Sequence, residues 1–252
     1  MESHPFQASL LDQFKNQITN FMEKNTGPYY AAFDADGTLW NNDLGEQFFQ
    51  YEIDHCHLES LKNVDPWHYY ESTKAVDPVK AYLWLAQINK GQPINNVKTW
   101  AAEAVERGGA KVFQSQKDWI SWLKDQGITV YIVTASVQWA VEPAAQMVGV
   151  DSQHVLGIRT KIDDQGIVGD EQDGWITWRE GKAQTLLKHT NGVAPIFCAG
   201  NTYGDISLLE SSACARLAVQ TQTIENGLFE EESRLLKHAL EMGWPTHHFF
   251  KT

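Results

Sequence analysis

Apolar positions along the chain fall into two kinds of pattern. Four short apolar runs are typical of strands buried in a parallel sheet: 29–33, 128–133, 195–199 and 215–219. Helical spacing of apolar residues recurs around these runs, over 6–23, up to 119–125, over 137–148 and 181–189, and in a last helix that ends near residue 240. Strands that alternate with helices predict an α/β fold, a Rossmann-like parallel sheet with helices on both faces.

The segment between the first and second apolar runs has a different character. Apolar and aromatic residues recur there with a roughly helical period and without strand alternation, interrupted at Asp65-Pro66, Asp77-Pro78, Gly91-Gln92-Pro93 and Gly108-Gly109. This pattern predicts an all-helical insertion. The chain is therefore expected to form a core domain from residues 1–40 and 110–252 and an inserted helical domain from residues 41–109.

Three local patterns carry smaller predictions. Residues 155–168 are predicted to form a hairpin around Asp164-Gln165-Gly166. Adjacent residues on a helix point in different directions, so His55-Cys56-His57 lacks the spacing of a zinc site and is not expected to hold a metal. The pair His247-His248 lies in a short tail and is predicted to be a solvated terminus.

Composition and charge narrow the classes of protein. Of the 252 residues, 42% are apolar and 21% are charged, which fits a globular chain and excludes a disordered or collagen-like one. The formal net charge of −12 argues against nucleic acid or an anionic membrane surface as a partner. Three cysteines indicate reduced thiols, and neither a basic leader nor an apolar run of about 18 residues occurs, so a cytoplasmic location is expected. The oligomeric state stays open.

Chemistry-bearing residues gather where the first apolar run ends, in Asp34-Ala35-Asp36-Gly37-Thr38. Two carboxylates this close to a buried strand repel each other, and a metal ion or a shared proton would relieve the repulsion. Gly37 lets the backbone turn closely around a ligand. The alternative is a plain Asp-rich turn.

Three further polar clusters follow strands or open helices. Thr134-Ala135-Ser136 offers a hydroxyl and backbone N–H groups for an anion at a helix start, or a helix cap at Ser136. Gly181-Lys182 opens a helix without the glycine and hydroxyl pattern of a Walker A loop; alone it could be a surface lysine. Asn201 and Asp205 present oxygens four residues apart that could hold Mg²⁺, or they form a polar turn with an aspartate cap.

The order and spacing of these clusters resemble the haloacid dehalogenase superfamily and, within it, the phosphatases. The resemblance rests on a D-x-D-x-T motif, a strand-end threonine, a lysine and a final polar motif: Asp34/Asp36/Thr38, Thr134, Lys182 and Asn201/Asp205. It spans roughly residues 29–219. The helical insertion resembles the helical cap of the phosphoserine-phosphatase-like branch, and the region around the first motif is similar to phosphorylcholine-phosphatase-like proteins.

The resemblance implies a role for each motif residue. Asp34 is the expected nucleophile, which forms an aspartyl-phosphate, and Asp36 the general acid and base. Lys182 is expected to neutralise charge and, together with Gly37, Thr134 and Ala135, to bind the phosphate. The expected cofactor is Mg²⁺, with these ligands: Asp34, the Asp36 main-chain carbonyl, and Asn201 or Asp205. The family usually has Asp where this chain has Asn201, whose amide oxygen can ligate Mg²⁺ as a neutral dipole.

The substrate is expected to be a small-molecule phosphomonoester. In phosphoserine phosphatases an acid shortly after the first motif faces the substrate ammonium, and its equivalent here is Asp43, close to Trp40. The insertion is rich in aromatic rings and contains one arginine, Arg107, which favours phosphocholine or phosphoethanolamine over a phosphoserine-like substrate, although the rings could simply pack the helices. Two other readings stay open: a phosphotransferase with the same chemistry, and a non-catalytic phosphate-binding regulatory protein, which Asn201 favours.

Overall fold

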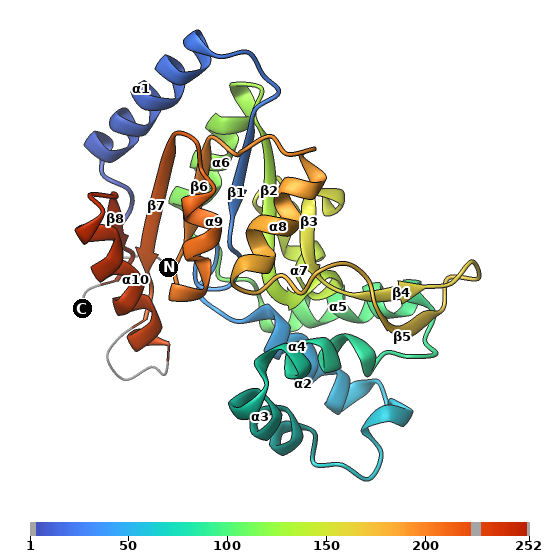
Figure 1. Cartoon of the computed structure of the whole chain (residues 1–252). Coiled ribbons are helices and arrows are strands. Elements are labelled where there is room, and N and C mark those ends of the chain that lie inside the picture. Colours follow the sequence, from blue (N-terminus) through green and yellow to red (C-terminus); the bar gives the residue numbers. More distant parts are fainter. Residues whose placement is uncertain (1–3, 223–227, 251–252) are drawn as a thin grey trace.

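A parallel sheet of six strands forms the centre of the computed structural model, which describes residues 4–222 and 228–250. Every neighbouring pair of strands in it is parallel. Their order across the sheet is β3 (Val155–Ile158), β2 (Thr129–Val137), β1 (Tyr30–Phe33), β6 (Phe197–Gly200), β7 (Ala215–Gln220) and β8 (Thr246–His248). This order places the ends of β1, β2 and β6 side by side, although they are far apart in the sequence (Figure 1).

Helices cover both faces of the sheet, which confirms the predicted α/β architecture. One core joins Phe33, Ile132 and Phe197 to the helices of one face: α1 (Ala8–Lys24), α6 (Gln114–Asp125) and α7 (Gln138–Met147). The second core joins Ala32 and Val133 to the helices of the other face: α8 (Glu180–His189), α9 (Ile206–Glu210) and α10 (Phe229–Glu241). Successive strand residues face opposite cores because side chains alternate along a strand.

Helices also fill the segment that interrupts the alternation. They are α2 (Leu44–His55), the short 3₁₀ turn η1 (Glu59–Leu61), α3 (Pro66–Val76), α4 (Pro78–Gln87) and α5 (Ile94–Gly108). Asp65 and Asp77 cap α3 and α4, each followed by proline at the first helical position. The group lies beside the carboxyl ends of β2 and β3 and shares a hydrophobic cluster with Val137 and Ile158 (Figure 1).

The predicted hairpin lies later in the chain than expected. Val155–Ile158 is β3, a fully buried edge strand of the main sheet that pairs with β2. The hairpin is formed by β4 (Thr160–Ile162) and β5 (Val168–Gln172), and Gly166 in its turn has a φ of +79°. Continuous burial separates the sheet strand from the exposed hairpin, a difference that the apolar pattern alone did not resolve.

The prediction of a solvated His247-His248 tail is wrong. Residues Thr246–His248 form β8, which pairs with β7 at the edge of the sheet. The His247 ring is only 8% exposed and packs edge-on against Phe6 and Phe249. Its Nε2 lies 2.9 Å from the carbonyl oxygen of His4. His247 is therefore part of the core while His248 is exposed, and the strand ties the two ends of the described chain together.

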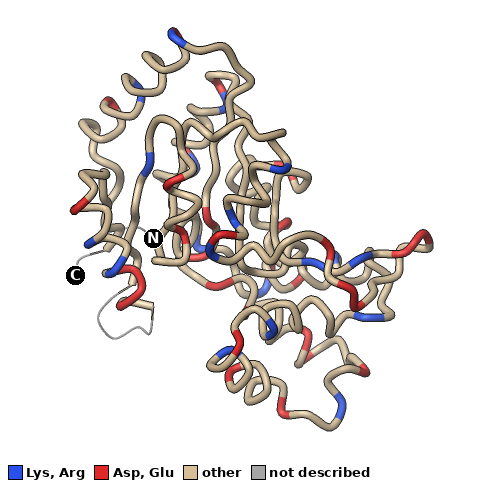
Figure 2. The backbone as a smooth tube through the Cα atoms, viewed as in Figure 1, with Lys and Arg blue, Asp and Glu red and all other residues tan. Residues whose placement is uncertain are grey.

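Charged residues are distributed without a basic stripe. Lys and Arg lie singly along the chain, interspersed with Asp and Glu (Figure 2). Across residues 4–222 and 228–250, no helix has both the length and the apolar character needed to cross a bilayer.

Candidate active site

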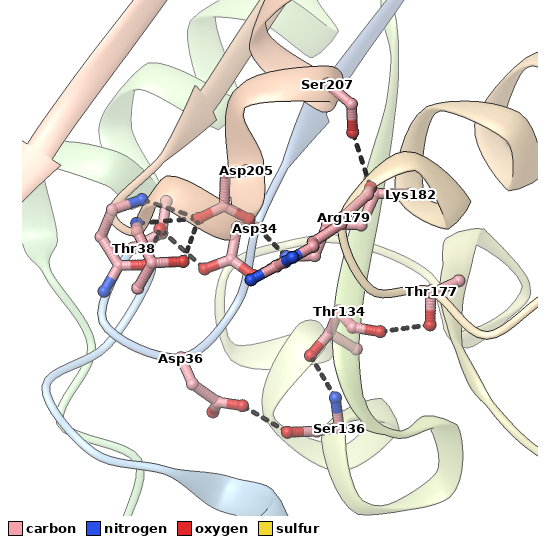
Figure 3. A network of polar contacts seen from close by, with 12 residues as sticks. Asp34, Asp36, Thr38, Thr134, Ser136, Thr177, Arg179, Lys182, Asp205 and Ser207 are labelled. Carbon is pink, nitrogen blue, oxygen red and sulfur yellow. Dashed lines mark hydrogen bonds and ion pairs between the residues drawn. The ribbon is translucent and has the colours of Figure 1, made fainter. Parts of the chain in front are cut away.

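Asp34 follows β1 directly and lies in the middle of the sheet edge. Its backbone N–H donates to the carbonyl oxygen of Ala199 in β6, and its side chain is only 8% exposed. Thr38 Oγ1 donates to Asp34 Oδ2 over 2.9 Å, and Lys182 Nζ donates to Asp34 Oδ1 over 2.5 Å (Figure 3). Asp34 is thus both held from two sides and buried.

Lys182 bridges two carboxylates. Its Nζ lies 2.5 Å from Asp34 Oδ1 and 2.5 Å from Asp205 Oδ1 (Figure 3). Burial acts to lower the pKa of Lys182, but the charges of Asp205 and Asp34 outweigh it and raise that pKa. Burial, followed by the charge of Asp205, raises the pKa of Asp34 to about 7 in spite of Lys182. One lysine thus faces an excess of negative charge.

Three hydrogen-bond donors hold the Asp36 carboxylate, and Lys182 is not one of them. Trp40 Nε1 and the Leu44 N–H donate to Asp36 Oδ1 over 2.7 and 2.9 Å. Ser136 Oγ donates to Asp36 Oδ2 over 2.6 Å (Figure 3). Burial is the main cause that raises the pKa of Asp36, and the three hydrogen bonds oppose it. A carboxyl with a raised pKa that lines a cavity is suited to donate a proton.

Trp40 and Gly37 lie behind the residues that line the cavity and do not line it themselves. Trp40 is fully buried in the core, does not line the cavity and reaches the site through its hydrogen bond to Asp36. Gly37 does not line the cavity either. A Cβ atom on Gly37 would lie 2.0 Å from Asn201 Nδ2, and φ at this glycine is +80°. Gly37 therefore makes room for Asn201.

Thr134, Ala135 and Ser136 line the cavity, but they are not at a helix start. Strand β2 continues through Val137, and its pairing with β3 shifts register between Val133 and Val137. The expected helix-start site or cap is therefore corrected to an irregular strand end. The Ser136 N–H donates to Thr134 Oγ1 over 3.0 Å, and Thr177 Oγ1 donates to the Thr134 carbonyl over 2.5 Å.

Asp205 is occupied on both oxygens. Besides Lys182 on Oδ1, its Oδ2 accepts from the Asn201 N–H at 3.1 Å and from the Thr202 N–H at 2.9 Å. The Thr202 hydroxyl donates to the same Oδ2 over 3.1 Å. Asp205 thus closes the turn after β6 and fixes Lys182, while the Asn201 side chain extends toward Thr38.

One cavity of about 290 Å³ is lined by the polar residues at the strand ends: Asp34, Asp36, Thr134, Ser136, Lys182, Asn201 and Asp205. The inserted helices contribute Asp43 and Glu46 from the start of α2, Tyr70 and Lys74 from α3, and Tyr82 from α4. Lys74 Nζ lies 3.0 Å from Glu46 Oε1 and 4.9 Å from the centre of the Tyr70 ring. A cavity of this size fits a small ligand rather than a polymer.

Several lining residues were not among the predicted ones. Arg179, just before α8, has a φ of +50° and stacks its guanidinium over Trp178 at 4.2 Å. Ser207 Oγ donates to the Arg179 carbonyl over 2.6 Å (Figure 3). The i, i+4 spacing of Tyr70 and Lys74 is the one sequence signal that could have placed both on one helix face.

The residues around Asp34 suit a hard cation. In the described part of the chain, no group of three or more His, Cys, Asp or Glu side chains is placed to hold a metal ion. A metal would therefore depend on neutral oxygens as well as carboxylates. Thr38 Oγ1 lies 2.9 Å from Asp34 Oδ2 and 3.3 Å from Asn201 Oδ1, so these two oxygens converge. An all-oxygen set with excess negative charge fits Mg²⁺.

Comparisons with known proteins agree with this arrangement. The family model of haloacid dehalogenase-like hydrolases matches residues 31–210. A phosphorylcholine phosphatase of Pseudomonas aeruginosa is 22% identical, with 74% of this chain and 72% of that protein covered.

Two solved structures share the fold. A Bordetella pertussis protein of unknown function has a TM-score of 0.69, at 19% identity over 89% of this chain and all of that one. A phospho-aspartyl intermediate analogue of phosphoserine phosphatase has a TM-score of 0.54, at 16% identity over 90% of this chain and 95% of that one. The predicted resemblance and the expectation of a hydrolase with phosphatase relatives are confirmed. Because the family model covers more than half of the residues, the chain belongs to the haloacid dehalogenase-like hydrolase family.

Proposed function

We propose that the chain is a Mg²⁺-dependent phosphatase that hydrolyses a small-molecule phosphomonoester through an aspartyl-phosphate on Asp34. One observation carries the proposal. Two carboxylates two residues apart are held in different ways at one cavity, Asp34 by buried Lys182 and Asp36 by Trp40 and Ser136. A nucleophile and a separate proton donor are the two groups that phosphate ester cleavage through a covalent intermediate requires.

The reaction has two steps. An Asp34 carboxylate oxygen attacks phosphorus while the bond to the ester oxygen breaks, and Asp36 gives its proton to the leaving alcohol. Water then attacks the same phosphorus, Asp36 takes a proton from that water, and inorganic phosphate leaves as the Asp34 carboxylate is restored. Proton transfer of this kind contributes about 10²–10⁴-fold to the rate.

Charge neutralisation supplies much of the remainder. Lys182 faces the nucleophile directly, and Thr134 with the Ala135 backbone lines the wall where phosphoryl oxygens would lie. The residues that would hold Mg²⁺ are Asp34, the Asp36 main-chain carbonyl and Asn201, while Asp205 fixes Lys182 beside them. Bound Mg²⁺ supplies positive charge to the phosphoryl group, as phosphoryl transfer requires.

The far end of the cavity supports a cationic leaving alcohol. The Lys74 ammonium lies against Glu46 and the Tyr70 ring, so the surroundings at this end of the cavity accommodate a cation. An ammonium over an aromatic face is a recognised way to bind choline-like groups. The name of the Pseudomonas relative points the same way. Phosphocholine is therefore the first candidate, followed by phosphoethanolamine and phosphoserine-like esters. Arg107 does not line the cavity and cannot bind a substrate carboxylate there.

The test is phosphate release from phosphocholine, phosphoethanolamine, phosphoserine and a neutral aryl phosphate, with MgCl₂ or with EDTA. We expect Mg²⁺-dependent turnover that Asp34→Asn abolishes and that Asp36→Asn lowers by about 10²–10⁴-fold. Asp12→Asn, an exposed carboxylate on α1, is the matched control and should leave turnover unchanged. Turnover that survives in Asp34→Asn would contradict the proposal.

A further inference from the structure

Asn201 has a buried partner on the last helix of the described chain. Glu232 of α10 is fully buried. Its Oε1 accepts from Asn201 Nδ2 at 2.9 Å and from the Thr221 hydroxyl at 2.8 Å. Its Oε2 accepts from the backbone N–H groups of Thr221 at 3.0 Å and Gln222 at 2.9 Å. Four donors therefore converge on one carboxylate, and no ion pair to it is formed among residues 4–222 and 228–250.

These contacts fix which way the Asn201 amide points. Glu232 has only acceptors to offer, so the donating NH₂ of Asn201 must face it. The amide oxygen then faces the opposite way, toward Thr38, whose hydroxyl also reaches Asp34. Gly37 leaves the space that the amide nitrogen occupies.

An aspartate at position 201 would meet a different environment. Its carboxylate would stand about 3 Å from the buried Glu232 carboxylate, and like charges this close in a buried site repel strongly. Asn201 and Glu232 are therefore chemically matched. In the family pattern residue 201 carries a negative charge. In this chain the charge lies on Glu232 of α10, the residue that Asn201 contacts.

We propose that Glu232 is a positioning residue: it holds the Asn201 amide oxygen toward Asp34 and supplies negative charge behind the Mg²⁺ ligands. This inference rests on the proposed function for the metal. It differs from the simpler view in which Asn201 is a weakened ligand that an aspartate would repair. The two views predict opposite results for Asn201→Asp.

The experiment is a double-mutant cycle of Asn201→Asp, Glu232→Gln and the two combined. Mg²⁺ binding is measured by calorimetry without substrate, and thermal unfolding is measured in EDTA. We expect Glu232→Gln to weaken Mg²⁺ binding by about tenfold, because the Asn201 amide loses its fixed orientation and the site loses a charge. Asn201→Asp should lower the unfolding temperature in EDTA and bind Mg²⁺ no more tightly than the parent. The double variant should recover both properties.

Each other outcome has a definite meaning. Any of three results would overturn the inference: additive effects of the two substitutions, tighter Mg²⁺ binding by Asn201→Asp alone at an unchanged unfolding temperature, or no Mg²⁺ binding by the parent. Glu230→Gln removes an exposed charge from the same helix and controls for net charge. Should Glu232→Gln fail to fold, Asn201→Asp by itself still separates the two views. These readouts use no substrate. If the two substitutions prove to be coupled but the protein shows no phosphatase turnover, the proposed function is contradicted and this inference still holds.

Discussion

At the scale of single residues, Trp40 shows how a buried side chain can serve the chemistry without reaching the substrate. Its indole N–H donates to Asp36 Oδ1 from inside the core. A hydrogen bond to a charged group contributes about 1.5–3 kcal/mol. Loss of this bond would free the Asp36 carboxylate to move away from the leaving oxygen.

We expect Trp40→Phe to lower kcat by about tenfold for every substrate, with KM unchanged within about twofold. The measurement is steady-state kinetics on phosphocholine and an aryl phosphate. Trp122→Phe, on α6 where the ring stacks on Trp119, is the matched control. A KM that changed for one substrate and not for the other would indicate direct contact instead.

Lys74 carries a prediction about specificity. Because its ammonium occupies the acidic and aromatic end of the cavity, a cationic substrate must displace it. Lys74→Met should therefore lower KM for phosphocholine by about tenfold and leave KM for a neutral aryl phosphate within about twofold. Lys80→Met, on the exposed side of α4, is the control. An increase of KM for phosphocholine would show that Lys74 attracts the substrate rather than competing with it.

Part of this site could be predicted from the sequence and part could not, and the difference has one physical reason. Asp34 and Asp36 follow β1, Thr134 lies near the carboxyl end of β2 and Lys182 lies in the first turn of α8, so the parallel sheet brings them to one edge. Lys74 and Glu232 lie on helices, and the residue spacing along those helices does not show that Lys74 lines the cavity or that Glu232 contacts Asn201. The burial of Trp40 could not be predicted, because an aromatic ring beside a motif can face either the ligand or the core.

At the scale of elements, β8 is the strand that the pattern did not predict. Three residues with two histidines have neither the length nor the apolar character of the other strands. The strand forms because β7 offers an open edge and because Phe6 and Phe249 enclose the His247 ring. Tertiary packing overrides local propensity at such an edge.

This burial predicts an acid-sensitive stability. Burial lowers the pKa of His247 to about 4, from an ordinary value near 6.5. Between these values the unfolded chain binds a proton that the folded chain excludes, so stability falls as pH decreases from about 6.5 to about 4, by about 3 kcal/mol in all. Urea unfolding of His247→Phe should lose this part of the pH dependence. His248→Phe, at the exposed neighbour, should keep it, and equal slopes in both variants would refute the assignment.

At the scale of the whole molecule, the cavity lies between two parts of the chain. The core contributes the reacting groups, and α2, α3 and α4 contribute the opposite wall. Tyr82 of α4 contacts Trp178 of the core, with ring centres 6.1 Å apart. A cavity of about 290 Å³ between these two walls suits a small ester better than a folded or polymeric substrate.

We therefore expect free phosphotyrosine to be hydrolysed with a kcat/KM about 100-fold or more above that of the same residue inside a peptide. The pair has one leaving group, so the comparison isolates size from chemistry. Phosphate release under equal Mg²⁺ is the measurement. Comparable rates on both esters would mean that the wall formed by the inserted helices does not restrict access.

The distance along the chain between Asp34 and Glu232 has a consequence for biosynthesis. Glu232 is added about 200 residues after Asp34, which at about 5–20 residues per second takes roughly 10–40 s. During that interval the emerging polypeptide carries its nucleophile but lacks the carboxylate that orients Asn201. A ribosome-bound chain that ends before α10 is thus expected to bind Mg²⁺ more weakly, and to hydrolyse phosphate esters more slowly, than the full chain. The hydrogen bond that orients Asn201 forms only after α10 has been synthesised and has packed against the sheet.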